Sequence, residues 1–75
     1  MVDCYRVTVR TLSGVTIMST PFALSTDWEE YWRMMTKDPE SLKVFAGVGK
    51  IILSKECLSP AGNWEAYAVV PMEVS

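Results

Sequence analysis

Histidine is absent from this 75-residue sequence, and cysteine occurs only twice, as Cys4 and Cys57. Histidine is the only side chain whose unperturbed pKa lies near neutrality, so its absence excludes Ser-His and Cys-His nucleophilic catalysis. Two distant cysteines without histidine also lack the ligand spacing of a zinc site, and we interpret both as reduced thiols. We therefore predict a protein that is not an enzyme and that binds no metal and no cofactor.

Long apolar runs and a strong net charge are also missing. No stretch approaches the ~20 apolar residues that cross a bilayer, and the opening residues lack the basic and apolar regions of a secretion signal. Nine acidic against seven basic residues give a net charge of −2, which provides no long-range field to attract a polyanion. We expect a cytoplasmic protein with neither membrane nor nucleic acid as partner. A weak nucleic-acid adaptor using Arg6, Arg10 and Lys50 remains an alternative.

What the sequence does contain is apolar bulk. Apolar residues make up 49% of the chain, with three Trp, three Tyr and two Phe, which is too rich for a disordered segment. A chain of this size buries only about 60–65% of the surface that it exposes when unfolded, which leaves nothing for a second core. We predict one small globular domain over residues 1–75.

The strongest pattern is a stripe of large apolar side chains. Trp28, Tyr31, Trp32 and Met35 fall at i, i+3, i+4 and i+7, which places all of them on one face of an α-helix. The residues Thr26 to Glu29 match a Ser/Thr-x-x-Glu capping box, so the helix is expected to start near Asp27. Four such side chains at helical spacing predict the core of the domain.

A second, shorter helix is predicted directly after the first. Asp38 is a suitable N-cap, and Pro39 suits the first helical position because its missing N–H is not needed there. Leu42 and Phe45 continue the helical spacing until Gly47, which we expect to close the element.

Alternation of apolar and polar residues predicts four strands in two hairpins. Gly14 suits the turn of the first hairpin, and Pro21 is expected to end its second strand because proline cannot donate to a ladder. A dense run of turn-forming residues lies between the last two strands. The predicted strands cover residues 2–10, 15–20, 50–58 and 64–70.

These elements predict an α+β two-layer domain of ββααββ order. Two hairpins around a helical segment form one four-stranded antiparallel sheet, with the main helix and the short second helix packed on one face. Phe22 and Leu24 are expected to plug the edge of the core. In the last strand we expect an inward set and an outward set: Trp64, Ala66, Ala68 and Val70 inward, Tyr67 and Val69 outward.

With catalysis excluded, we expect a protein-protein interaction module. It would cover a surface of a larger protein, as a small inhibitor or accessory factor of the phage or mobile-element type does. An edge strand, residues 15–20 or 50–58, is expected to take up another strand. The alternative is a homodimer that uses the open sheet face or an edge strand. The expected partner-binding residues are Tyr67, Val69, Met34, Arg6 and Arg10.

Overall fold

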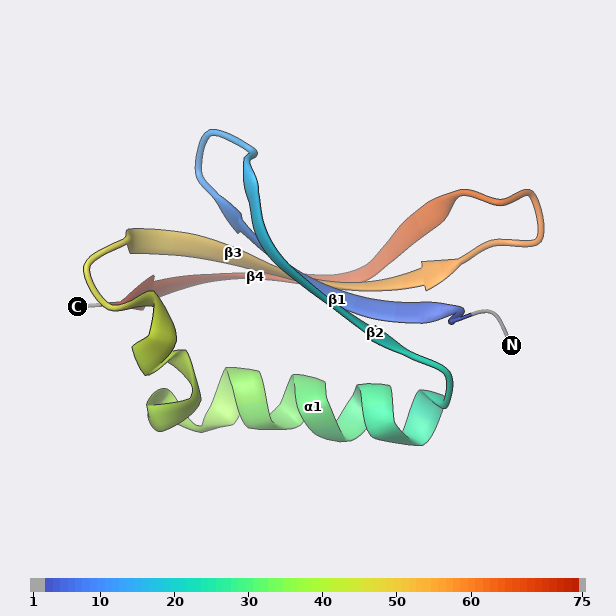
Figure 1. Ribbon diagram of the computed structural model, residues 1–75, viewed down its shortest axis with the longest axis horizontal. Helices are drawn as coiled ribbons and strands as arrows, with labels where there is room; N and C mark the ends of the chain where they lie inside the picture. Colours follow the sequence, from blue (N-terminus) through green and yellow to red (C-terminus); the bar gives the residue numbers. More distant parts are fainter. Residues whose placement is uncertain (1–2, 75) are drawn as a thin grey trace.

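The computed structural model describes residues 3–74, which form two strands, an α-helix, a 3-10 helix and two further strands (Figure 1). The strands make one four-stranded antiparallel sheet in the order β2-β1-β3-β4. The elements are β1 (Tyr5–Thr11), β2 (Thr16–Phe22), α1 (Ser25–Lys37), η1 (Pro39–Phe45), β3 (Gly49–Leu58) and β4 (Trp64–Val74).

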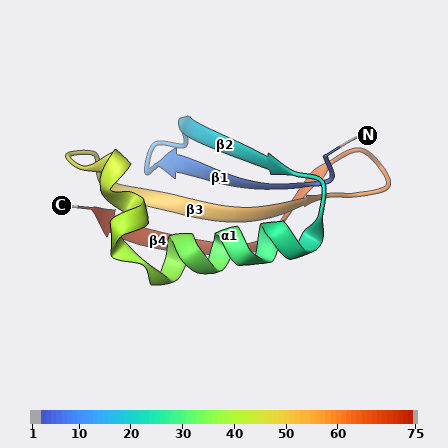
Figure 2. The ribbon, with the colours of Figure 1, turned by 60° about the horizontal axis from the view of Figure 1, so that its bottom comes forward.

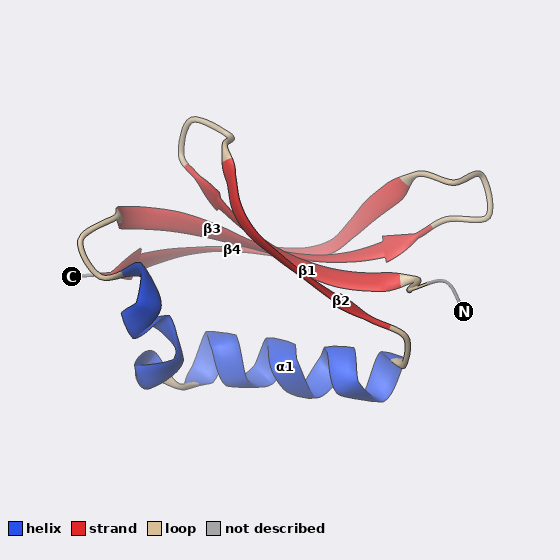
Figure 3. Ribbon diagram, viewed as in Figure 1, coloured by secondary structure: helices blue, strands red, loops and turns tan. Residues whose placement is uncertain are grey.

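Both helical elements lie on the same side of the sheet, so the predicted α+β fold with its antiparallel sheet is confirmed (Figure 3). The order is ββαηββ, however, because the second helical element is a 3-10 helix. This element spans seven residues, which is long for a 3-10 helix, since runs beyond three or four residues are uncommon. Figure 2 shows α1 running beneath the sheet and η1 turning up from its end toward β3.

The core lies between α1, η1 and the sheet. Trp28 and Met35 are 3% and 2% exposed, while Tyr31 and Trp32 are half-buried and pack against the same core. The apolar stripe therefore faces the sheet, as predicted. The other buried apolar residues come from β1, η1, β3 and β4, and they are Val7, Val9, Leu42, Phe45, Ile51, Leu53 and Val74.

The start of α1 differs from the prediction. The helix begins at Ser25, its N-cap is Leu24, and no side chain caps it. Thr26 therefore lies inside the first turn, where its hydroxyl cannot act as an N-cap, and the predicted capping box is wrong.

Phe22 contacts the ring of Tyr31 at 5.1 Å between centroids and is half-buried, as expected. Leu24 is 58% exposed and does not plug the core.

The entry to η1 matches the prediction. The Asp38 carboxylate accepts a hydrogen bond from the backbone N–H of Glu40 at 3.1 Å, and a proline stands at the start of the helix. The helix ends at Phe45, and Gly47 follows with a φ of 89°, in the left-handed region that glycine adopts without steric cost.

Strand order corrects one prediction about the sheet edges. The segment 50–58 was expected as a possible edge, but β3 lies between β1 and β4, so the edges are β2 and β4. The long connection through α1 and η1 lets β3 pair with the side of β1 that β2 leaves open. No local sequence pattern determines that β3 pairs with β1.

Strand lengths also differ from the prediction. β1 begins at Tyr5; the start predicted at residue 2 lies outside the described residues. β2 continues through Pro21, which pairs with Arg6, and β4 continues past Pro71 to Val74. Both strands are edges, where a proline N atom can face away from the ladder and no sheet hydrogen bond is lost.

A β-bulge in β4 reverses part of the predicted facing. Ala66 lies opposite Glu56 and Ala68 lies opposite Lys55, so Tyr67 is an extra residue between them. Such a bulge moves the following residues to the other face. Three residues thus face as predicted: Ala68 and Val70 toward α1, and Val69 away from it. Trp64 and Ala66 were expected to face inward but face away from α1. Tyr67 lies on the α1 side, 5.7 Å from the ring of Trp28, so its predicted outward position is wrong.

Candidate protein-binding face

The side of the sheet that faces away from α1 is the candidate site, and we term it the open face. Neither α1 nor η1 covers it, and Figure 1 shows the ends of both hairpins bending away from α1 on this side. Its central residues come from three strands and are Arg6, Thr8, Arg10, Ser54, Glu56, Trp64 and Val69.

Glu56 is the centre of a polar network on this face. Its Oε1 accepts from Arg6 Nε at 2.6 Å, and its Oε2 accepts from Arg10 Nη1 at 2.9 Å and from the Ser54 hydroxyl at 2.8 Å. Arg10 Nη1 also donates to the Thr8 hydroxyl at 2.7 Å. Both carboxylate oxygens of Glu56 are therefore bonded to groups that prefer the ionised form.

The network is buried although it lies on the side without a helix. Thr8, Ser54 and Glu56 are 1%, 3% and 5% exposed. Arg10 bonds to Thr8 and Glu56, Arg6 bonds to Glu56, and the Ser54 hydroxyl donates to Glu56. Burial raises the pKa of Glu56, but the hydrogen bonds from Ser54, Arg10 and Arg6 and the charge of Arg10 outweigh it and leave the pKa below its ordinary value. The carboxylate is thus ionised in neutral solution.

The two arginines are held in place but remain accessible. The Arg6 guanidinium stacks on the Trp64 ring at 4.1 Å from its centroid, a cation–π contact. The side chains of Arg6 and Arg10 are 26% and 28% exposed, and each guanidinium has N–H donors beyond the one that bonds to Glu56. Two arginines around one glutamate leave one positive charge on the open face.

The structure brings together three of the five predicted partner-binding residues. Arg6, Arg10 and Val69 share the open face, where Val69 is 56% exposed and pairs with Ser54. Tyr67 is 67% exposed but lies on the α1 side, and Met34 is 44% exposed on α1. The five residues therefore do not form one surface.

Sequence reasoning missed Glu56, Thr8, Ser54 and Trp64 as members of this site. A signal was present, since Ser54 and Glu56 share strand parity and so do Arg6, Thr8 and Arg10. What the sequence did not give was the pairing of β1 with β3, which places these two polar rows side by side.

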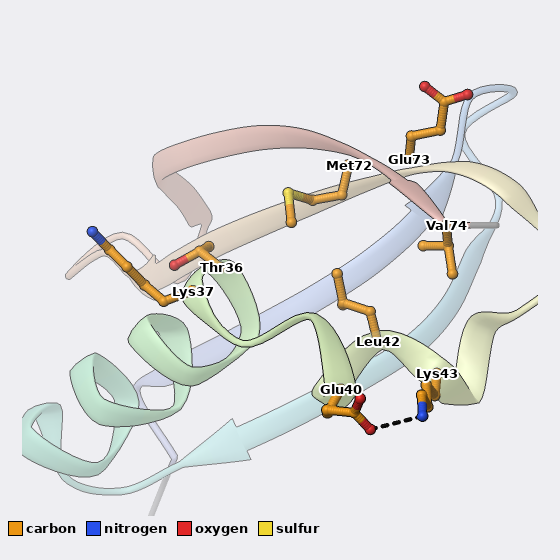
Figure 4. A pocket seen from close by; sticks show the side chains of 8 residues that line it. All are labelled: Thr36, Lys37, Glu40, Leu42, Lys43, Met72, Glu73 and Val74. Atoms are coloured by element: carbon orange, nitrogen blue, oxygen red, sulfur yellow. Dashed lines mark ion pairs between the residues drawn. The ribbon is translucent and has the colours of Figure 1, made fainter.

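A separate cleft of about 400 Å³ lies between the end of α1, η1 and the end of β4 (Figure 4). Its charged side chains are exposed, and two of them, Glu40 and Lys43, pair with each other at 2.8 Å. Within residues 3–74 the structure shows no group of acidic or cysteine side chains arranged to hold a metal ion. We assign no chemistry to this cleft, whose lining residues are Thr36, Lys37, Glu40, Leu42, Lys43, Met72, Glu73 and Val74.

No helix in the described part of the chain has both the length and the apolar character to span a membrane. Comparison with protein-family models, with curated proteins and with solved structures finds no match. The functional proposal is therefore carried by the geometry of the open face.

Proposed function

We propose that the protein is a non-enzymatic binding module whose open face binds an acidic segment of a larger protein. The observation that carries this proposal is the pair of arginines held around Glu56. Arg6 bonds to Glu56 through Nε and Arg10 through Nη1, which leaves further guanidinium N–H groups of both side chains for a ligand.

A carboxylate suits these groups best. The planar guanidinium of arginine matches the two oxygens of a carboxylate, and the remaining positive charge of the network is neutralised when a carboxylate binds. Immobilising a long side chain on binding costs about 0.5–1.5 kcal/mol, and the bonds to Glu56 and the stacking on Trp64 reduce that cost in advance.

The apolar residues nearby suit a protein partner. Trp64 is half-buried beside Arg6, and Val69 is exposed on the same face. Tryptophan and arginine in partly desolvated surroundings are the residue types that contribute most to protein interfaces. The open face therefore offers an acidic peptide both charge pairing and apolar contact.

Binding is favoured over catalysis by the state of the one buried carboxylate. Glu56 has both oxygens occupied by donors and a lowered pKa, so it carries no proton to donate at neutral pH. A general acid or base needs a pKa near the working pH and a free path to the substrate. Glu56 is better suited to position the two arginines.

The test is affinity capture from an extract of the source cells with three variants. Val69→Asp adds a negative charge to the open face, Val69→Lys adds a positive charge there, and Met34→Asp is a matched control on α1. We expect a captured protein to be retained by Val69→Lys and by Met34→Asp, lost with Val69→Asp, and released by salt.

Equal capture by Val69→Asp and the unchanged protein would overturn the proposal. Loss of capture with Met34→Asp would move the binding surface to α1. Release of the captured material by nuclease would identify nucleic acid as the ligand instead.

A further inference from the structure

The exposed apolar residues of the open face lie in a row along β4. The first four residues that β4 directs to this face are apolar; the first is half-buried and the other three are exposed. Neighbouring residues on one face of a strand lie about 7 Å apart, so the row forms a continuous strip. We term it the β4 strip, and its residues are Trp64, Ala66, Val69 and Pro71.

The two arginines form a single anchor beside one end of the β4 strip. They are four positions apart on β1, but Arg6 Nε lies 2.6 Å from Oε1 of Glu56 and Arg10 Nη1 lies 2.9 Å from Oε2. Both guanidinium groups are therefore next to the same carboxylate. Glu56 stands opposite Ala66, and Arg6 stacks on Trp64, which places the anchor at the Trp64 end of the strip.

The opposite end of the β4 strip is electrically neutral. After Pro71 the open face continues with Glu73, which stands opposite Lys50 of β3, and both charged side chains are exposed. Among the described strand residues, this face has three cations and two anions and therefore a net charge of +1: Arg6, Arg10, Lys50, Glu56 and Glu73. One carboxylate neutralises that charge, and further acidic groups would lack a counter-charge.

We infer that the acidic segment lies along β4, with one carboxylate on Arg6 and Arg10 and apolar side chains on Val69 and Pro71. This inference rests on the proposed function and specifies its ligand. Val69 and Pro71 are the next two members of the strip after Ala66, so the apolar side chains lie about 7 and about 14 Å from the level of the carboxylate. The ligand is thus a segment with one acidic residue and with apolar residues on one side of it.

Selection from a displayed library of short random peptides, with the unchanged protein as bait, tests the inference. We expect the enriched peptides to share one aspartate or glutamate with apolar residues on one side of it. Replacing that acidic residue by its amide in a synthetic copy of an enriched peptide should weaken binding at least about tenfold, because the charge-assisted bonds to the arginines are lost.

Calorimetry with the same peptide tests the β4 strip separately from the arginines. Val69→Ser removes apolar surface from the strip without changing the charge, and Val44→Ser makes the same change at a 76% exposed valine of η1, on the other side of the sheet. We expect about three- to tenfold weaker binding by Val69→Ser, because less apolar surface is buried, and unchanged binding by Val44→Ser.

Two kinds of failure are distinguishable. Enriched peptides with several acidic and no apolar residues, or equal affinity of Val69→Ser and the unchanged protein, overturn this inference and leave the proposed function standing. Equal weakening by Val44→Ser also overturns the assignment of the β4 strip. Enriched peptides without any acidic residue, or no enrichment at all, overturn the proposed function and this inference with it.

Discussion

The ammonium group of Lys55 lies 4.6 Å from the ring centroid of Trp28, and the Lys55 side chain is only 12% exposed. Lys55 also pairs with Glu29 of α1. The rings of Tyr5 and Tyr67 lie 4.7 and 5.7 Å from that of Trp28, and Trp28 Nε1 donates to the backbone carbonyl of Arg6 at 3.0 Å. Trp28 thus joins the first half of α1 to the sheet through several contacts at once.

Trp28→Ala should therefore cost about 3–5 kcal/mol, because it leaves a cavity, removes the hydrogen bond to the Arg6 carbonyl and leaves Lys55 without its aromatic neighbour. Such a loss is a large part of the total stability of a domain, which is about 5–15 kcal/mol. Trp32 is half-buried, so Trp32→Ala should cost less. Urea unfolding followed by far-UV circular dichroism compares the two variants, and equal losses would contradict the assignment of Trp28 as the deeper core residue.

The two predicted helix caps can be separated in the same way. Asp38→Ala removes the acceptor of the Glu40 N–H and should destabilise the protein by about 1 kcal/mol. Thr26→Ala should change the stability by less than about 0.5 kcal/mol, because Thr26 is exposed and caps nothing. Denaturant midpoints of both variants give the comparison; a larger loss for Thr26→Ala would restore the capping box that the sequence predicted.

Local patterns predicted the elements of this protein but only some of the residues of its candidate site. The stripe of α1, the cap at Asp38 and the glycine after η1 are properties of neighbouring residues, and all three were recognised. The contact between Arg6 and Glu56 joins residues 50 positions apart and exists only because β3 crosses to pair with β1. The predicted face of Tyr67 was wrong for a related reason. A bulge inverts the period-2 alternation of a strand without leaving a clear mark in the sequence.

Removal of the carboxylate charge at the centre of the open face should be costly. Glu56→Gln leaves Arg6 and Arg10 close together without a counter-charge and keeps only one acceptor oxygen. Because the arginines are partly exposed and the glutamate is buried, we expect a loss of about 1–3 kcal/mol at neutral pH. Glu65→Gln, an exposed neighbour on β4, is the control and should stay within about 0.5 kcal/mol in denaturant unfolding.

In the unchanged protein, acid should remove the stabilisation that the ionised Glu56 carboxylate provides. The pKa of Glu56 in the folded chain is below its ordinary value of 4.5, so the unfolded state binds the proton more tightly. The stability that Glu56 provides is therefore fully present above pH 4.5 and is lost as the pH falls through the lower pKa of the folded state. The Glu56→Gln variant lacks this carboxylate, so acid cannot remove its contribution to stability. The other carboxylates titrate in both proteins. The difference in unfolding free energy between the two proteins should consequently shrink as the pH falls below 4.5; urea unfolding at a series of pH values measures it, and a difference that stays constant would show that Glu56 is not held ionised by the arginines.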